Sequence, residues 1–257
     1  MSSTLPDVDL TKLPTRAPKH MHKAETKREM RKIREELVEW QERLYAENKR
    51  SILVVLQGMD ASGKDGLIRR VFSGINPQGV RVYSFKEPTK EELAHDFLWR
   101  IHQRTPGHGM VHVFNRSHYE DVLITRVVGL IDDATAKQRF EAINHFEKLL
   151  QQAGTTVLKF YLNVSEKEQE ERLADRVSNP SKQWKYEPGD DQKTKQWPEY
   201  RRVYQDVFRQ CSPPTCPWHI LPADQKWYTA YEVARTLRDA LAEMDPAYPE
   251  SKLTRPE

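Results

Sequence analysis

Hydrophobic positions along the chain follow two patterns, and segments with the two patterns alternate. Short continuous apolar runs, typical of strands buried on both faces, fall at residues 51–57, 80–85, 110–114, 156–164 and 217–221. Apolar residues spaced three or four apart predict helices at 30–44, 64–73, 91–103, 119–128, 134–153, 166–177 and 228–241. Because strands that alternate with helices are joined by crossovers, we expect an α/β fold with a mostly parallel sheet covered by helices on both faces.

The N-terminal segment shares neither period. Residues 1–22 contain Pro6, Pro14 and Pro18 and lack a repeated apolar spacing, which predicts an arm rather than a helix or a strand. A length of 257 residues suits one α/β domain with additions better than two full domains. We therefore expect an arm over 1–22 and a single domain over 23–257.

Composition excludes some classes of protein but selects none. The chain is 37% hydrophobic and 31% charged, with a mean hydropathy of −0.82 and a net charge of +3. We expect neither a membrane helix nor a secretory signal, because the apolar runs are short and the N-terminus lacks the signal pattern. Cys211 and Cys216 lie in one Pro-rich turn without further ligands at zinc spacing, so free thiols in a reducing cytoplasm are expected.

A phosphate-binding loop lies between the first strand and the helix that follows it. Gly58-x4-Gly63-Lys64 matches the G-x-x-x-x-G-K pattern, whose glycines let backbone N–H groups turn toward a phosphate. The helix N-terminus adds partial positive charge, and the lysine adds a full one. The residues predicted to bind phosphate here are Gly58, Ser62, Gly63, Lys64, Asp65 and Gly66.

Two carboxylates distinguish this loop from a simple ATP cradle. Asp65 occupies the position where Ser or Thr usually holds Mg²⁺, and Asp60 lies within the loop. Carboxylates repel a bound phosphate unless a cation lies between them, so Asp60 is predicted to bind Mg²⁺ or to contact an acceptor group. For Asp65, a carboxylate stabilised by the helix dipole is an equally good interpretation.

A second candidate element follows the third strand. An acidic Mg²⁺ ligand is expected where that strand ends, but the position holds Asn115, and Glu120 and Asp121 restore negative charge one turn later. Arg116 leaves the strand toward the loop, where its guanidinium could bind two phosphate oxygens or form a structural salt bridge. The residues predicted to be catalytic are Asp60, Lys64, Arg116, Glu120 and Asp121, with Asp60 and Glu120 as metal ligands.

These motifs resemble the polyphosphate kinase 2 family. The similarity is strongest in Gly58-Met-Asp-Ala-Ser-Gly-Lys-Asp-Gly66 and Phe114-Asn-Arg-Ser-His-Tyr-Glu-Asp121, and it extends over residues 30–250. The resemblance implies a P-loop kinase fold with a helical lid, dependence on Mg²⁺ (or Mn²⁺), and reversible phosphoryl transfer between inorganic polyphosphate and nucleotides. With Asn at position 115, the second motif resembles the subgroup often called class III, whose members phosphorylate both AMP and ADP. The other subgroups carry Asp at this position. The resemblance also implies a homo-oligomer, a dimer or tetramer, for which the helix at 30–44 offers a contact.

Binding polyphosphate requires cations spaced along a channel, because the chain carries about one negative charge per phosphate. Cations that could converge on such a channel are Lys64, Arg69, Arg70, Lys86, Arg116 and Arg126. The segment 172–200 mixes cations with Pro180, Pro188 and Gly189, which predicts a lid that excludes water, or else an ordinary basic surface loop. The candidate lid cations are Arg172, Arg176, Lys182 and Lys185.

Three other functions fit parts of the sequence. An ATP-dependent nucleoside or nucleotide kinase would share the fold, and a regulatory nucleotide-binding module would share the loop. The basic N-terminal third could bind nucleic acid, but its aromatic residues, such as Trp40, Phe72 and Tyr83, fall on apolar helical or strand positions. Arg116 and two acidic positions around one phosphate loop exceed what binding alone requires. We therefore expect an enzyme that uses polyphosphate with AMP, ADP and ATP, without nucleic-acid or membrane partners.

Overall fold

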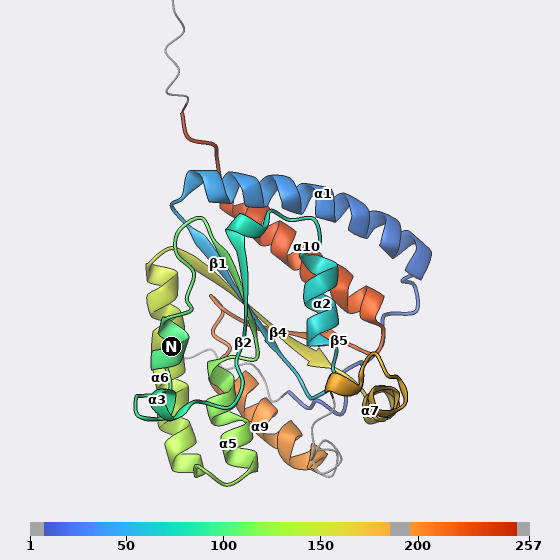
Figure 1. The fold of residues 1–257 in the computed structure, drawn as a ribbon, viewed down its shortest axis with the longest axis vertical. Helices are drawn as coiled ribbons and strands as arrows, with labels where there is room; N and C mark the ends of the chain where they lie inside the picture. The colour runs from blue at the N-terminus through green and yellow to red at the C-terminus, as the bar shows by residue number, and fades with distance from the viewer. Residues whose placement is uncertain (1–7, 186–195, 251–257) are drawn as a thin grey trace, which may run out of the picture.

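A five-stranded parallel β-sheet forms the centre of the protein (Figure 1). The computed structural model describes residues 8–185 and 196–250. The strands lie in the order β2-β3-β1-β4-β5, and every neighbouring pair is parallel. Their bounds are Ser51–Gln57 (β1), Val80–Ser84 (β2), Val111–Asn115 (β3), Thr155–Asn163 (β4) and Trp218–Pro222 (β5). The parallel α/β fold and the five strands predicted from the sequence are confirmed, with small shifts at the strand ends.

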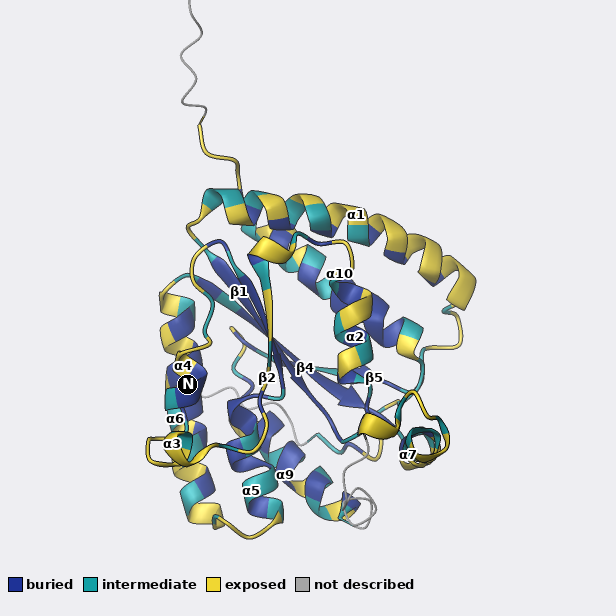
Figure 2. Ribbon diagram, in the orientation of Figure 1, coloured by how far each residue is buried: buried dark blue, intermediate teal, exposed yellow. Residues whose placement is uncertain are grey.

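Helices cover both faces of this sheet. On β4, Lys159 bonds to Glu147 of α6, and the ring of Tyr161 packs against Tyr204 of α9. Side chains alternate along a strand, so Phe160, which lies between these two residues, faces the opposite side, where α10 packs against β4 and β5. α1 and α2 pack against α10 (Figure 1), and β1 is completely buried between the layers (Figure 2). The bounds of the longer helices are Lys23–Glu47 (α1), Lys64–Val71 (α2), Asp133–Gln152 (α6), Glu166–Ser178 (α7), Trp197–Gln210 (α9) and Lys226–Met244 (α10).

Two predicted helices are broken in the structure. The helix predicted at 91–103 is two short helices, separated at 94–98, where the Asp96 carboxylate accepts a hydrogen bond from the backbone N–H of Leu98. A local bond of this kind competes with helical hydrogen bonding, which explains the interruption. The helix predicted at 119–128 is a 3-10 turn followed by a short helix. The bounds of the short elements are Pro77–Gly79 (η1), Lys90–Leu93 (α3), Trp99–His102 (α4), His118–Val122 (η2), Ile124–Val127 (α5) and Gln183–Lys185 (η3).

The N-terminal arm is attached to the body of the protein from residue 8 onward. Leu10 is buried in the core, and the backbone N–H of Ala17 donates to the side chain of Gln225. Thr15 donates from its hydroxyl to the Asp224 carboxylate and accepts from the Asp224 backbone N–H. These contacts hold irregular backbone, which leaves no periodic signal, so the sequence predicts the arm but not its attachment.

The amphipathic face of α1 is used within the chain. Met30, Ile33, Leu37 and Leu44 are buried, and the helix packs along α10. These apolar residues therefore pack inside the chain, and an oligomer contact through the helix at 30–44 stays a prediction. None of the helices in the described ranges has the length and apolar character that crossing a membrane requires.

Candidate phosphoryl-transfer site

The phosphate-binding loop leaves the carboxyl end of β1, the central strand. β3 lies on one side of β1 and β4 on the other, so the loop emerges where the strand order reverses, the usual ligand position in open α/β sheets. Gly58 has φ +151°, and a Cβ there would lie 2.9 Å from Ser62 Oγ and 3.1 Å from the carbonyl oxygen of Leu162. Gly63 has φ +106° and is the N-cap of α2. The loop thus joins a buried strand to a helix, as the sequence predicts.

Lys64 is buried at the start of α2 and folds back onto its own loop. Its ammonium donates to the backbone carbonyls of Gly58 (2.7 Å) and Met59 (3.2 Å). Burial, together with the nearby Arg116 guanidinium, lowers the pKa of Lys64 to about 8 against the pull of nearby carboxylates. A phosphate would supply the counter-charge that this ammonium lacks, and the N-terminus of α2 adds to the attraction. The loop therefore favours an anionic ligand.

Arg116 lies between two carboxylates beside the loop. Its guanidinium forms ion pairs with Asp60 from the loop and with Glu120 from η2, the latter at 3.3 Å. Burial disfavours the charge of the guanidinium, but Glu120 and Asp60 outweigh this effect and raise the pKa of Arg116. The backbone of Arg116 has φ +65°, uncommon for a residue with a side chain, and its N–H donates to the carbonyl of Leu56 at the end of β1. This turn after β3 brings Arg116 to the loop.

Two tyrosines of α9 complete a small pocket around these charges. Its lining consists of Gly58, Met59, Asp60, Arg116, Glu120, Leu123, Tyr200 and Tyr204. Burial raises the pKa of both tyrosines, and nearby carboxylates raise it further, so both remain neutral hydroxyls. α9 is absent from the predicted elements, although its apolar face has the helical spacing i, i+3, i+4, i+7, i+8. That spacing, which could have identified both tyrosines, is given by Tyr200, Val203, Tyr204, Val207 and Phe208.

The two positions that depart from the usual phosphate-loop pattern contact each other. The side-chain amide of Asn115, at the end of β3, donates a 2.8 Å hydrogen bond to the carboxylate of Asp65 in α2. An aspartate at 115 would place two carboxylates at this distance, whereas a serine or threonine at 65 would remove the acceptor. The missing acid on β3 and the extra acid after Lys64 are thus one paired feature. The bond favours a structural role for Asp65 at the start of the helix over a metal-ligand role.

Asp121 and Arg126 are engaged in ion pairs around the site. The Asp121 carboxylate lies 3.8 Å from Arg100 and 3.9 Å from Arg139, and burial raises its pKa to about 6 against these two cations. Arg126 is buried in α5 and pairs with one carboxylate of α6 and one of α9. Both residues therefore connect neighbouring helices, and their predicted roles in catalysis and in polyphosphate binding stay predictions.

Arg172 holds the phosphate loop in place from α7. Its guanidinium donates to the loop carbonyls of Ala61 (3.1 Å) and Ser62 (2.8 Å). It also donates to the carbonyls of Ala223 (2.7 Å) and Asp224 (3.1 Å), between β5 and α10. Since backbone carbonyls occupy this buried side chain, the prediction that Arg172 is a lid cation is wrong. It fixes the loop to the neighbouring part of the fold.

The other predicted phosphate ligands and lid residues lie nearer the surface. Lys182 pairs with Asp175 of α7, and Arg176 is half-buried. Arg69, Arg70 and Lys86 have exposed side chains. The Lys185 side chain and residues 186–195, which include much of the predicted lid, lie outside the described residues.

Buried charges on the far side of η2 fix the segment that carries Arg116 and Glu120. The Glu147 carboxylate of α6 accepts from the Tyr119 hydroxyl (2.7 Å) and the Lys159 ammonium (2.5 Å), and His118 lies 3.3 Å away. Burial opposes the charge of Glu147, but Lys159 and His118 lower its pKa to about 2. This network ties the turn after β3 to β4 and α6, so the position of Arg116 is set by the core.

Asp60 and Glu120 are the two carboxylates that line the pocket beside the loop. In residues 8–185 and 196–250, no group of three or more His, Cys, Asp or Glu side chains could hold a metal without other ligands. A magnesium ion that binds together with phosphates needs only one or two protein carboxylates. The two carboxylates around Arg116 therefore fit an ion that the phosphates help to hold.

The arrangement at the end of β1 gathers positive charge around a phosphate position, in a parallel sheet with the loop at its switch point. The fold and the site therefore define a P-loop phosphotransferase. The family model for polyphosphate kinase 2 matches residues 20–249, and the chain belongs to that family. The resemblance predicted from the sequence motifs is confirmed.

Relatives and a solved structure support this assignment over most of the chain. The AMP/ADP-polyphosphate phosphotransferase of Meiothermus ruber is 47% identical over 210 residues, which cover 82% of this chain and 79% of the relative. The ADP-polyphosphate phosphotransferase of Rhodopseudomonas palustris is 37% identical over 261 residues, covering 96% and 90%. The crystal structure of polyphosphate kinase 2 from Arthrobacter aurescens matches with a TM-score of 0.93 at 40% identity, covering 98% of this chain and 91% of that one.

Proposed function

We propose that the protein transfers phosphoryl groups from inorganic polyphosphate to AMP and to ADP, forming ADP and ATP in a reversible, Mg²⁺-dependent reaction. The observation that carries the proposal is the family match over residues 20–249, together with a relative at 47% identity whose name specifies both acceptors. The pairing of Asn115 with Asp65 joins the two departures from the usual phosphate-loop pattern in one contact.

In the proposed mechanism the protein supplies charge and position rather than a nucleophile. The loop N–H groups, the N-terminus of α2 and Lys64 hold the phosphates, and the Lys64 ammonium exchanges loop carbonyls for phosphate oxygens. Arg116, positioned by Asp60 and Glu120, spreads the negative charge that develops as the phosphoryl group passes in line to the acceptor oxygen. Tyr200 helps to close the pocket around these groups.

Asp60 and Glu120 are the proposed Mg²⁺ ligands, and the bound ion would neutralise charge on the phosphate oxygens. Arg116 also pairs with both carboxylates, so Asp60 and Glu120 would hold the metal and orient the arginine. We further propose a homo-oligomer, a dimer or tetramer, on the basis of the family resemblance. A cytoplasmic setting fits the two buried free thiols, Cys211 and Cys216.

The test is to incubate the purified protein with Mg²⁺, long-chain polyphosphate and either AMP or ADP, without ATP, and to follow the nucleotides by chromatography. We expect ADP and then ATP from AMP, and ATP from ADP. Product with ADP alone would contradict the dual-acceptor proposal. Product only when ATP replaces polyphosphate would instead support an ATP-dependent nucleotide kinase.

A further inference from the structure

A chain of buried hydrogen bonds leads from the phosphate loop through α7 to the start of α9. The side-chain amide of Gln169, in α7, donates from Nε2 to the backbone carbonyl of Asp60 (2.9 Å). Its Oε1 accepts from the indole N–H of Trp197, the first residue of α9 (2.6 Å). Both side chains are buried, with 1% of Gln169 and 4% of Trp197 exposed. We call these two residues the Gln169–Trp197 relay.

The relay has a single hydrogen-bonding direction. An indole nitrogen donates but does not accept, and a backbone carbonyl accepts but does not donate. The amide of Gln169 must therefore turn its oxygen toward Trp197 and its nitrogen toward Asp60. Because every group in this chain is buried, the loss of either side chain would leave a polar atom without its partner.

The relay belongs to a set of bonds that hold the loop carbonyls on the side of α7. Gln169 and Arg172 lie one turn apart on the buried side of this helix. Together they donate to the carbonyls of three consecutive loop residues, Asp60, Ala61 and Ser62. Ala61 has φ +60°, which is uncommon for a residue with a side chain and needs surrounding contacts to hold it. Carbonyls held toward α7 leave the loop N–H groups for the phosphate.

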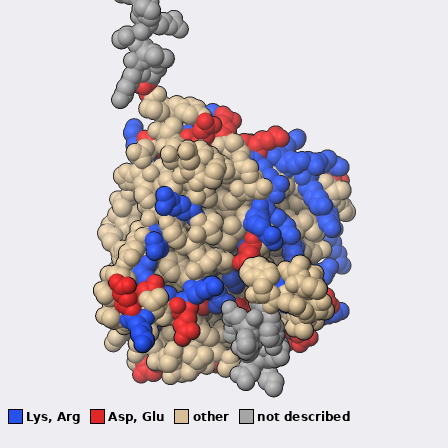
Figure 3. Space-filling view, viewed as in Figure 1, with Lys and Arg blue, Asp and Glu red and all other residues tan. Residues whose placement is uncertain are grey.

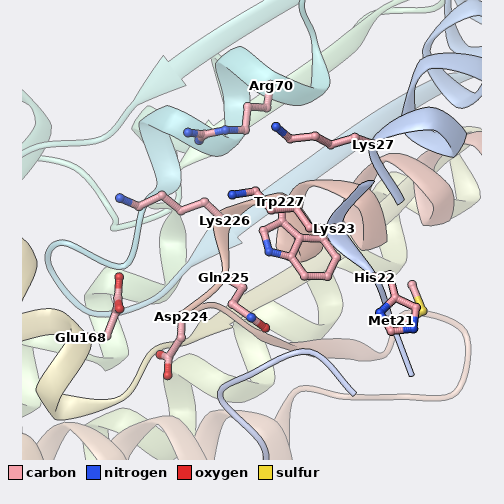
Figure 4. Close-up of a pocket in the computed structure, with 10 residues that line it drawn as sticks. All are labelled: Met21, His22, Lys23, Lys27, Arg70, Glu168, Asp224, Gln225, Lys226 and Trp227. Carbon is pink, nitrogen blue, oxygen red and sulfur yellow. The ribbon is translucent and has the colours of Figure 1, made fainter. Parts of the chain in front are cut away.

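The open side of α7 has a different environment. Glu168 pairs with Arg172 and lines a groove of about 720 Å³ beside α2, which the start of α1, Arg70 and Lys226 also line (Figure 4). Lys and Arg side chains gather on that part of the surface, over α1 and α2 (Figure 3). The relay is instead enclosed by α7, the loop and α9, where it is almost fully shielded from solvent.

The face of α9 that begins with Trp197 also carries the pocket tyrosines. Trp197, Tyr200 and Tyr204 follow the helical spacing i, i+3, i+7, and all three are buried. The two tyrosines line the small pocket together with Asp60 and Arg116. The relay therefore connects two walls of this pocket, the loop and α9, through a single side chain of α7.

We propose that Gln169, directed by Trp197, is a positioning residue that sets the direction of the Asp60 carboxylate and thereby the place of the Arg116 guanidinium during phosphoryl transfer. The backbone carbonyl and the side chain of Asp60 leave the same Cα atom, so fixing the carbonyl limits the directions open to the carboxylate, which pairs with Arg116. The inference rests on the proposed function, since the groups that are positioned belong to that site.

The test measures kcat and KM with polyphosphate and ADP for Gln169→Leu, alone and combined with Asp60→Asn. We expect Gln169→Leu to lower kcat about 30-fold, with the KM for ADP within about twofold, because small displacements of catalytic groups cost rate more than binding. Combined with Asp60→Asn, the same change should cost less than about twofold, because no carboxylate is left to position. The matched control is Gln41→Leu, which should leave both constants unchanged. Gln41, in α1, is equally buried, and its amide has no hydrogen-bond partner in residues 8–185 and 196–250.

The other end of the relay is tested by Trp197→Phe, which keeps an aromatic ring and removes the N–H. We expect kcat to fall about tenfold, because the amide of Gln169 loses the bond that directs it. The double variant Gln169→Leu/Trp197→Phe should be no slower than Gln169→Leu alone, since the two residues act as one unit. Trp40→Phe, which alters a partly buried tryptophan of α1, is the control and should leave kcat unchanged.

Three results would overturn the inference: an unchanged kcat in Gln169→Leu, the same fold loss with and without Asp60→Asn, or independent losses from the two relay positions. The second result would show that Gln169 supports the fold without acting through Asp60. If the unmodified enzyme transfers no phosphoryl group from polyphosphate, the proposed function itself fails, so the two failures are distinguishable.

Discussion

At the scale of single residues, the site contains buried cations whose protein partners compensate their charges only in part. Lys64 donates to carbonyls of its own loop, and Arg116 is shared by two carboxylates that are also the candidate metal ligands. Charges held in this way need little rearrangement to accept phosphate oxygens, which is the preorganisation that phosphoryl transfer uses.

The cost of burying the Lys64 ammonium predicts opposite effects of Lys64→Met on activity and stability. Turnover should fall at least about 100-fold, because the variant lacks the positive charge that contacts the phosphates. The free energy of unfolding at pH 7 should stay constant or rise by about 1 kcal/mol, since the folded state disfavours the charged form. Steady-state kinetics and thermal melts check both values, with Lys148→Met, an exposed lysine of α6, as the control. A marked fall in Tm would show that Lys64 is structural.

The lowered pKa of Lys64 also predicts the pH dependence of the free enzyme. Below a pH of about 8 the ammonium is charged and binds phosphate, and above it the neutral amine does not. The value of kcat/KM should therefore fall by about tenfold per pH unit above this point. In Lys64→Arg, residual activity should lack this alkaline limb, because a guanidinium stays charged. A limb that persists in this variant would assign the titration to another group.

The contact between Asn115 and Asp65 predicts a coupled pair. Asn115→Asp should lower the free energy of unfolding at pH 7 by about 1–2 kcal/mol, because two carboxylates would face each other. Adding Asp65→Asn exchanges the two groups and should restore most of the loss. Chemical denaturation of the single and double variants measures the coupling, and additive effects would contradict the pairing.

At the scale of elements, α7 is a brace for the loop. Arg172→Lys should lower the free energy of unfolding by at least about 2 kcal/mol, because one ammonium cannot reach carbonyls on both the loop and the turn before α10. We also expect kcat to fall and KM to rise, because α7 would no longer hold the loop in place. The control Arg28→Lys, an exposed residue of α1, should leave melting curves and kinetics unchanged. Unaltered stability of Arg172→Lys would return this residue to the lid role predicted from the sequence.

Periodic elements and contiguous motifs were predictable from the sequence, whereas long-range contacts were not. The run at 51–57 and the Gly58–Lys64 loop mark β1 and the site because the chemistry is local. Arg172 was misassigned because its four carbonyl partners come from two distant segments. The attachment of residues 8–22 was missed for the same reason, since irregular backbone contacts have no period. α9 had the helical spacing and could have been found.

At the scale of the whole molecule, the fold brings four separated segments to one edge of the sheet. The loop after β1 and the turn after β3 carry the charges, α7 braces the loop, and α9 closes the pocket. The arm and α1 then extend this edge into the basic groove beside α2 (Figure 4).

The central claim is that polyphosphate is the phosphoryl donor, and ³¹P NMR tests it most directly. Enzyme, Mg²⁺, long-chain polyphosphate and AMP are mixed without ATP, with Lys64→Met as the matched control. The account predicts that the signal of interior polyphosphate phosphates declines as the β-phosphate of ADP and then the γ-phosphate of ATP appear, and that the control shows none of these changes. A spectrum in which polyphosphate and AMP persist unchanged with the unmodified enzyme would contradict it.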